Sequence, residues 1–405
     1  MAVGDVELEL VLESLAFGGE AVGRDAGGRV VFVAGGAPGD RVVVRVIEDK
    51  RTFARAELVR IVAAGEARVA APCPIVGSCG GCPWQHVAVE AQLAAKQAIV
   101  ARTLGKLGVR VEAIVPSPAA LGYRTRARMT VRGAAIGFAG RRSHEIVDVE
   151  RCIALDPTLD AAMQAGRRAL GPLIGEDGAL SGLVRDGGVE LAVTSGRGVD
   201  RARLQAAAGA LVGQAAIARV TVDDANAPAA GFAQANVAQN ETLRRLVRDA
   251  ARADGERVLE LYAGDGNFTR DLAAVARGGV AVEGDRPAAA RLRVRLAGDA
   301  AGAAWKIAAD SSARAVERLV ADGERFGVVV LDPPRAGAAD VVARLPSLAP
   351  ERIVYVSCDP MTLARDLATL SRLGYSARVA WPVDMMPHTW HVEVVCLITR
   401  AANPG

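Results

Sequence analysis

The segment 351–367, ERIVYVSCDPMTLARDL, places a cysteine where an apolar strand ends and a helix begins. Polar residues flank Cys358 on both sides, and Pro360 opens the helix. Most free cysteines are small buried hydrophobic side chains, and Cys396 within VVCLI fits that description. The polar setting of Cys358 at a strand end instead favours a thiolate nucleophile that can attack an electrophilic carbon.

A second group of cysteines has the spacing of a metal site. Cys73, Cys79 and Cys82 lie within CPIVGSCGGC, and Cys152 follows later in the chain. In a chain of cytosolic character, such thiols are more often metal ligands or catalytic groups than disulfides. Four thiolates suit either a tetrahedral zinc ion or a 4Fe-4S cluster, and the spacing alone does not separate the two.

The segment VLELYAGDGNFTRDLA, residues 258–273, predicts a nucleoside site. A strand runs into Gly264 and Gly266 and then into a helix, so backbone amides can approach a ligand that a β-carbon would block. Glu283 ends the next strand, where a carboxylate can accept hydrogen bonds from ribose hydroxyls. The third glycine of a dinucleotide fingerprint is missing, which favours S-adenosylmethionine over NAD. Asp310, after the third strand, suits either the adenine amino group or a helix N-cap.

The segment LDPPRAG ends another strand abruptly. Neither proline can donate a ladder hydrogen bond, so Asp332 is expected at the carboxyl edge of the sheet. Methyltransferases that act on amino groups usually carry an aromatic residue after these prolines, and Arg335 stands there instead. An exocyclic amino group is therefore the less favoured methyl acceptor.

Composition places the chain among globular proteins. Its 405 residues are 51% apolar and 23% charged, which predicts two or three domains with large cores. The N-terminal MAVGDVELEL is acidic and no long apolar run follows, so neither a signal peptide nor a membrane span is predicted, and we expect a cytoplasmic protein. The net charge of +3 is too small to indicate a nucleic-acid partner. Four arginines in YRTRARMTVRG form either an RNA-facing strand or a solvated one; they are Arg124, Arg126, Arg128 and Arg132.

Three parts must position these residues. Residues 1–62 alternate short strands with Gly-rich turns, which predicts a small β-barrel. Residues 63–230, with the cysteines and arginines, predict a mixed α+β domain. Residues 231–405 alternate apolar strands with helices, which predicts an α/β domain with a doubly wound, mostly parallel sheet.

In this order, LELYAGDGNFT, LDPPRAG, YVSCDPMTLARDL and VDMMPHTWHVEVVCLI resemble the RNA uracil-5 methyltransferases of the RumA and TrmA kind. The N-terminal strands resemble the TRAM domain, an RNA-binding barrel, and GFAQAN resembles the stretch that precedes the cofactor domain in this family. The resemblance covers nearly the whole chain. It implies a sheet of strand order 3-2-1-4-5-7-6, in which strand 7 alone is antiparallel.

The resemblance also implies the role of each site residue. Cys358 would add to carbon-6 of uracil, and Glu393 would remove the proton from carbon-5. The topology of the resembled sheet brings Cys358, Glu393, Asp332 and the glycine turn to one edge. The S-adenosylmethionine contacts would be Gln234, Tyr262, Gly264, Gly266, Asn267, Glu283, Asp310 and Asp332. The cysteines Cys73, Cys79, Cys82 and Cys152 would hold a 4Fe-4S cluster rather than zinc.

The substrate is expected to be 23S rRNA, because tRNA-modifying members of this family generally lack both the TRAM domain and the cluster. No obligate protein partner and no membrane partner is expected. Alternatives are a tRNA uracil-5 methyltransferase, an RNA cytosine-5 methyltransferase and a non-catalytic RNA-binding assembly factor. Cytosine-5 enzymes usually carry a second cysteine near the Asp-Pro-Pro turn, and LDPPRAG has none. An inactive domain tends to lose its nucleophile or base, and both are present here.

Overall fold

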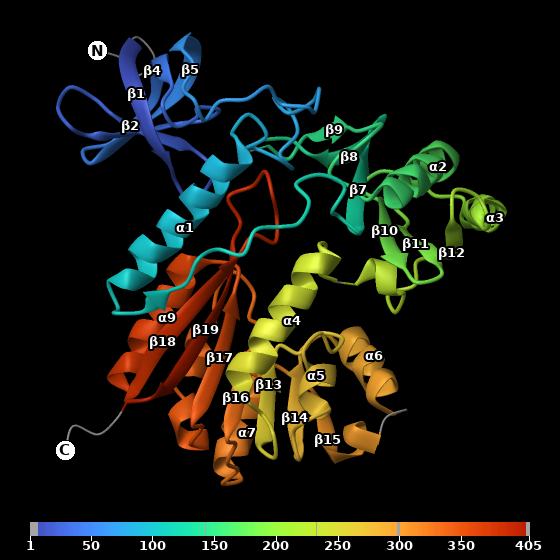
Figure 1. Cartoon of the computed structure of the whole chain (residues 1–405). Helices are drawn as coiled ribbons and strands as arrows, with labels where there is room; N and C mark the ends of the chain where they lie inside the picture. The colour runs from blue at the N-terminus through green and yellow to red at the C-terminus, as the bar shows by residue number, and fades with distance from the viewer. Residues whose placement is uncertain (1–6, 142, 232, 298–299, 402–405) are drawn as a thin grey trace. The chain divides into compact units, whose positions relative to one another are not determined.

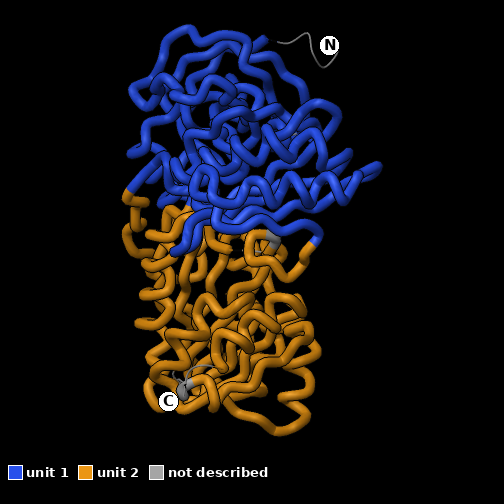
Figure 2. Tube along the Cα trace, turned by 90° about the vertical axis from the view of Figure 1, so that its right-hand side faces the viewer, with its two compact units in different colours: residues 1–99, 119–223, 386–391 blue, residues 100–118, 224–385, 392–405 orange. Residues whose placement is uncertain are grey.

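A computed structural model describes residues 7–141, 143–231, 233–297 and 300–401 of the chain. Phe232, within the GFAQAN stretch, lies outside these described residues. The strands form three sheets with their covering helices (Figure 1). The chain divides into two compact units and passes repeatedly from one to the other (Figure 2). Unit 1 contains residues 1–99, 119–223 and 386–391; unit 2 contains residues 100–118, 224–385 and 392–405.

The N-terminal strands close into a barrel of order β1-β2-β3-β5-β4, which confirms the predicted β-barrel. The strands are β1 (Glu7–Leu15), β2 (Ala21–Arg24), β3 (Val30–Val33), β4 (Arg41–Asp49) and β5 (Phe53–Ala63). Alternate residues of β1, such as Leu10 and Leu12, are buried because one face of each strand lines the barrel interior. Trp84 and Ile99 belong to the same hydrophobic core, so the packing of the barrel extends beyond its strands.

The second sheet of unit 1 has six strands in the order β12-β11-β10-β7-β8-β9. They are β7 (Arg126–Arg132), β8 (Ala135–Ala139), β9 (Ile146–Asp148), β10 (Ala179–Arg185), β11 (Gly188–Thr194) and β12 (Ile217–Val222). The helices α2 (Pro157–Ile174) and α3 (Arg201–Leu211) pack on this sheet. α2 begins at Pro157 because the side chain of Asp156 accepts hydrogen bonds from the first free amides, those of Thr158 and Leu159.

Unit 2 contains an eight-stranded sheet of order β15-β14-β13-β16-β17-β19-β18-β6. The strands are β6 (Arg110–Val111), β13 (Arg257–Leu261), β14 (Gly278–Glu283), β15 (Trp305–Ala309), β16 (Val328–Leu331), β17 (Arg352–Ser357), β18 (Tyr375–Val383) and β19 (Glu393–Arg400). β19 runs antiparallel to both of its neighbours. The predicted order 3-2-1-4-5-7-6 is confirmed, and β6 adds one strand that was not predicted.

Helices cover both faces of this sheet. They are α4 (Val237–Ala251), α5 (Thr269–Ala273), α6 (Arg286–Ala297), α7 (Ser312–Ala321), α8 (Ala339–Val342) and α9 (Pro360–Arg372), together with the C-terminal part of α1 (Val89–Gly105). In Figure 1, α4 lies across the sheet, and it contacts β16, β17 and β19. α9 buries Leu363, Leu367 and Leu370, which recur every three or four residues and therefore form one apolar face.

The two units divide the chain differently from the three predicted parts. Residues 100–118 group with unit 2 because β6 pairs with β18 as an edge strand. Residues 386–391 group with unit 1, although they lie within residues 231–405, the part for which the sequence predicts an α/β domain. The barrel and the six-stranded sheet belong to one unit. Among the helices that the structure describes, none has the length and apolar character needed to cross a membrane.

Candidate active site

The turn that follows β17 presents Cys358 at the carboxyl edge of the sheet. Asp359 caps α9, since its side chain accepts hydrogen bonds from the amides of Met361 (2.8 Å) and Thr362 (3.1 Å). The Ser357 hydroxyl accepts a hydrogen bond from the Asp359 amide (3.2 Å). The hydrogen bonds of the polar residues around Cys358 therefore hold the strand-to-helix turn. The half-buried thiol of Cys358 is not needed to hold this turn.

Glu393, the first residue of β19, lies across from this turn. The ladder between β17 and β19 ends with Ser357 opposite Val394, so Cys358 and Glu393 both lie just beyond its last pair. The charge of Glu393 raises the pKa of Cys358, which is consistent with the two side chains being near each other. Glu393 is only 7% exposed, and its burial raises its pKa above the ordinary range of a glutamate; the charge of Asp332 raises it further. Such a carboxyl can hold a proton near neutral pH.

Asp332 follows β16 at the same edge, where its amide donates to the carbonyl of Leu261 (3.4 Å). Burial raises the pKa of Asp332 as well. Arg335, three residues later, is exposed on the Pro-Pro turn, and its charge lowers the pKa of both Cys358 and Glu393. Sequence reasoning used Arg335 only to disfavour amino-group substrates and missed this electrostatic role.

The surroundings of Cys358 disfavour its thiolate form. Its pKa is raised to about 12, chiefly by burial and also by the charges of Glu393 and Asp332, whereas Arg335 lowers it. The thiolate is therefore a minor species until a cation enters the site or the neighbouring carboxyls take up protons.

The turn after β13 contains two glycines, so its backbone amides are accessible to a nucleoside ligand. Gly264 and Gly266 have φ values of 58° and 99°, in the left-handed region that favours glycine. A Cβ on Gly266 would lie 2.6 Å from Leu292, whereas a Cβ on Gly264 would meet no atom within 4 Å. Tyr262 also has a positive φ, 61°, which is rare for an aromatic residue and concentrates at functional sites.

Glu283 closes this turn from the end of β14. One carboxylate oxygen accepts from the amide of Gly264 (2.7 Å), and the other accepts from the amide of Asp285 (2.6 Å). Each carboxylate oxygen has a second lone pair, so Glu283 can still accept hydrogen bonds from a ligand hydroxyl.

The other predicted cofactor contacts have partners of their own. The side-chain amide of Asn267 exchanges two hydrogen bonds with Asn240 of α4 (2.8 and 2.9 Å). Asp310 accepts from the amide of Ser311 (2.8 Å) and pairs with Arg318 (2.6 Å), both of which lower its pKa. The N-cap of α7 is Ser311 rather than Asp310.

Gln234 is half-buried in the segment just before α4. Asn236, two residues later, caps α4 by accepting from the amide of Gln239 (3.2 Å) and also donates to the carbonyl of Met385 (3.2 Å). The asparagine of the GFAQAN stretch therefore has a structural role.

Sequence reasoning missed a buried carboxylate in β13. Glu260 is 1% exposed, and burial raises its pKa to about 8, with Asp332 and Glu283 adding to the effect. The hydroxyl of Thr269 lies beside it, yet within the described part of the chain neither carboxylate oxygen makes a well-formed hydrogen bond. A buried carboxylate without a donor is costly unless a ligand supplies one, so this group marks a position for a cation. The signal in the sequence was an acidic residue inside an otherwise apolar strand.

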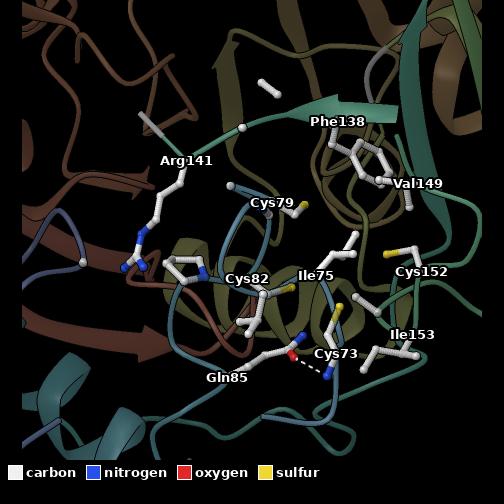
Figure 3. A pocket seen from close by; sticks show the side chains of 18 of the residues that line it. Cys73, Ile75, Cys79, Cys82, Gln85, Phe138, Arg141, Val149, Cys152 and Ile153 are labelled. Carbon is white, nitrogen blue, oxygen red and sulfur yellow. Dashed lines mark hydrogen bonds between the residues drawn. The ribbon is translucent and has the colours of Figure 1, made fainter. Parts of the chain in front are cut away.

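The four predicted metal ligands line one cavity in unit 1, whose volume is about 360 Å³ (Figure 3). Burial raises the pKa of the thiols of Cys79, Cys82 and Cys152, in the case of Cys82 to about 11. The amide of Cys73 is held by the side chain of Gln85 (3.1 Å). Across the described ranges, no three His, Cys, Asp or Glu side chains converge on a position for a single metal ion. Four thiols that line one cavity are the donor set that a 4Fe-4S cluster requires.

The four predicted RNA-facing arginines do not share one environment. Arg128 is exposed on β7 and makes a long hydrogen bond to Ser181 (3.4 Å). Arg132 is exposed but pairs with Asp177 (3.1 Å). Arg126 is half-buried, and burial lowers its pKa. Arg124 lines the cysteine cavity.

Comparison with known proteins places this geometry in a family. Residues 223–401 match the family described as tRNA (Uracil-5-)-methyltransferase, and residues 6–59 match the TRAM domain. The chain is 34% identical to the 23S rRNA (uracil(1939)-C(5))-methyltransferase RlmD of Halomonas elongata, with 96% of this chain and 89% of that protein aligned. It is also 34% identical to the RlmD of Pseudomonas aeruginosa, with 96% and 93% aligned.

The fold has a solved counterpart in the tRNA (uracil-54, C5)-methyltransferase of Pyrococcus abyssi, which was determined with S-adenosyl-L-homocysteine. The TM-score is 0.73 at 24% identity, with 96% of this chain and 99% of that chain covered. At this identity the likeness concerns the fold. Through its identity with the RlmD proteins over nearly its whole length, the chain belongs to the S-adenosylmethionine-dependent RNA uracil-5 methyltransferase family, as the sequence motifs predicted.

Proposed function

We propose that this protein methylates carbon-5 of a uridine in 23S rRNA. The observation that carries the proposal is the meeting of Cys358, Glu393 and Asp332 at one edge of a methyltransferase sheet, beside the glycine turn. The substrate follows from the RlmD relatives, which match this chain from barrel to last strand.

Carbon-5 of uracil is a poor nucleophile and must be activated. The thiol of Cys358 first loses its proton to solvent. The thiolate sulfur then forms a bond to carbon-6, and the displaced electron pair moves into an enolate that spans carbon-5 and the carbon-4 oxygen. S-adenosylmethionine supplies an electrophilic methyl group, which carbon-5 attacks, and the carbon–sulfur bond to that methyl breaks. Glu393 then takes the proton from carbon-5, the bond from Cys358 to carbon-6 breaks, and the double bond re-forms. Since a stacked base does not expose carbon-6, the target uridine leaves the RNA stack.

The electrostatics of the site suit this sequence of steps. Ionisation of Cys358 needs positive charge nearby, and Arg335 together with the cofactor sulfonium supplies it. The raised pKa of Glu393 matches a base that must accept a proton and release it near neutral pH. The charge of Asp332, which is half-buried, helps to maintain that raised pKa.

The cofactor would lie along the carboxyl edge of β13 and β14. The open backbone at Gly264 and the free lone pairs of Glu283 suit the ribose, and Glu260 suits the cofactor ammonium. We retain the remaining contacts predicted from the family, which are Gln234, Tyr262, Gly266, Asn267, Asp310 and Asp332. The partners of Asn267 and Asp310 make these two supporting residues that hold the shape of the pocket.

Cys73, Cys79, Cys82 and Cys152 would hold a 4Fe-4S cluster. Their shared cavity supports this assignment, and so does the buried Nε of Arg124 at this cavity, which has no acceptor among the described residues. A cluster held there would join the segment at residues 73–82 to that at residue 152 and so fix the loops beside the six-stranded sheet. The barrel and the exposed side chain of Arg128 are the proposed RNA-binding elements.

Methyl transfer in vitro tests this function. Purified protein would be incubated with S-adenosylmethionine that carries an isotopically labelled methyl group and, separately, with unmodified 23S rRNA and with tRNA. Digestion to nucleosides should place the label in 5-methyluridine from 23S rRNA. Label in 5-methylcytidine, or in tRNA alone, would refute the proposed substrate.

A further inference from the structure

Arg124 stands out among the residues that line the cysteine cavity. Its backbone is held against the segment that carries the fourth cysteine: the Arg124 amide donates to the carbonyl of Ala154 (2.9 Å), and the Arg124 carbonyl accepts from the amide of Asp156 (2.8 Å). Two residues before it, the Gly122 amide donates to the carbonyl of Ile153 (3.0 Å). The position of Arg124 relative to Cys152 is therefore set by main-chain bonds that do not depend on its side chain.

The side chain of Arg124 enters the cavity with an unused donor. Its Nε is buried, and within the described ranges it has no hydrogen-bond partner. A buried guanidinium N–H without an acceptor is unfavourable, so its persistence indicates an acceptor that the cavity receives. Arg124 lines the same cavity as all four proposed ligands, and this shared lining places its side chain beside the position of the cluster.

The charge balance of the cavity points to an anion. Two further arginines line it, Arg141 and Arg151, and its one lining carboxylate, Glu20, is paired with Arg55. Arg151 has a side chain that is 75% exposed and pairs with Asp160 (3.5 Å), and Figure 3 shows Arg141 extending away from the cysteine sulfurs. Arg124 is thus the cavity arginine with a buried and unused donor.

We propose that the Nε–H of Arg124 donates a hydrogen bond to a sulfur of the bound cluster, and that this bond with the guanidinium charge raises the cluster's reduction potential and slows its loss. A cluster with four thiolate ligands is an anion that gains further negative charge on reduction. A nearby cation and an N–H donor therefore stabilise the reduced form more than the oxidised form. The inference rests on the 4Fe-4S cluster proposed above.

The test compares Arg124→Gln with Arg151→Gln in the full-length protein, purified anaerobically. Both variants remove one positive charge from the lining of the same cavity, and both keep the backbone bonds. At a fixed solution potential we expect Arg124→Gln to lower the ratio of reduced to oxidised cluster at least tenfold, equivalent to about 59 mV for one electron. We also expect a ferrous chelator to bleach its cluster absorption at least tenfold faster. Arg151→Gln should stay within twofold of wild type in both measurements.

A third variant separates the hydrogen bond from the charge. Arg124→Lys keeps the cation but lacks the planar Nε–H donor, so its potential should fall between those of wild type and Arg124→Gln. It also provides a readout if Arg124→Gln fails to fold. Equal reduction potentials and bleaching rates in Arg124→Gln and Arg151→Gln would overturn the inference. If Arg124→Lys had the reduction potential of wild type, the proposed hydrogen bond would be refuted. Iron and sulfide analysis of the wild type tests the cluster itself: stoichiometric zinc without sulfide would refute the cluster, whatever the variants do.

Discussion

Glu393→Gln should separate the formation of a covalent RNA adduct from its resolution. Glutamine matches glutamate in size but does not take the carbon-5 proton, so elimination of Cys358 should stall after methyl transfer. Glu393 is buried directly beyond the last pair of the β17–β19 ladder, and a neutral amide should fit there without disturbing the sheet. The variant should therefore accumulate RNA linked to Cys358.

In Glu393→Gln, resolution of the covalent adduct should become slower, whereas its formation should not. Loss of a general base slows a step by about 10²–10⁴, or roughly 3–5 kcal/mol of barrier, and this is the expected slowing of resolution. Formation should be at least as fast as in the wild type, because the Glu393 charge is one cause of the Cys358 pKa of about 12. At pH 8 that pKa leaves about one thiol in 10⁴ ionised, and each unit of decrease would raise the thiolate population tenfold.

A single-turnover assay with labelled RNA measures both steps. Samples quenched in denaturant would be resolved on a gel, where the adduct migrates as a shifted band, and the linked peptide would be identified by its mass. Cys358→Ala should give no adduct, whereas Cys396→Ala should behave as wild type because Cys396 is fully buried within β19. Wild-type turnover by Glu393→Gln, or a linked peptide containing Cys396, would refute this reasoning.

Four further predictions concern charged side chains of the active site and of the proposed RNA-binding strand β7. Because the pKa of Glu260 is raised to about 8, its ionised fraction increases as the pH rises toward that value. Below about pH 7.5 the cofactor ammonium keeps its charge, so affinity for S-adenosylmethionine should rise between about pH 6 and 7.5 in wild type and not in Glu260→Gln. Equal pH profiles of the two proteins in calorimetric titration would contradict this. The same raised pKa affects the stability of the cofactor-free protein. As the pH rises from about 4.5 toward 8, the contribution of Glu260 to the free energy of unfolding should fall by up to about 5 kcal/mol. The melting temperature of Glu260→Gln should therefore depend less on pH than that of wild type. Arg335→Gln should raise the pKa of Cys358 and slow adduct formation, with recovery at higher pH, and an unchanged rate would exclude this role. Arg128→Gln should weaken RNA binding and reduce by about one the slope of the logarithm of the binding constant against the logarithm of the salt concentration. Arg132→Gln should leave this slope unchanged, because the guanidinium of Arg132 is already paired with Asp177. Equal slopes in the two variants would argue against Arg128 as an RNA contact.

Elements with strong local patterns could be predicted from the sequence. The central parallel strands contain continuous apolar runs, VVVL in β16 and IVYV in β17, and each of these strands is followed by a polar turn that placed Asp332 and Cys358 at one edge. The barrel strands alternate buried and exposed residues and are separated by glycine turns, so their closure was also predictable.

Features that depend on contacts distant in sequence could not be predicted. β6 has only two residues, Arg110 and Val111, which is too short for any periodicity to show. The arginine run gave no sign that Arg124 would line the cysteine cavity, because that depends on main-chain bonds to the segment around residue 154. The reciprocal amide pair of Asn267 and Asn240 joins a turn to a helix and likewise has no local signature. Glu260 was visible as an acid in an apolar strand, but its lack of a partner emerges only from the packing.

The most direct test of the central claim is to map 5-methyluridine, nucleotide by nucleotide, in 23S rRNA and tRNA from cells that lack this gene. Cells without the gene should lose 5-methyluridine at one or a few positions of 23S rRNA and keep it in tRNA. The wild-type gene should restore the modification, and the Cys358→Ala variant, expressed at the same level, should not. An unchanged 23S rRNA pattern in the deletion strain, or restoration by Cys358→Ala, would contradict the proposed function.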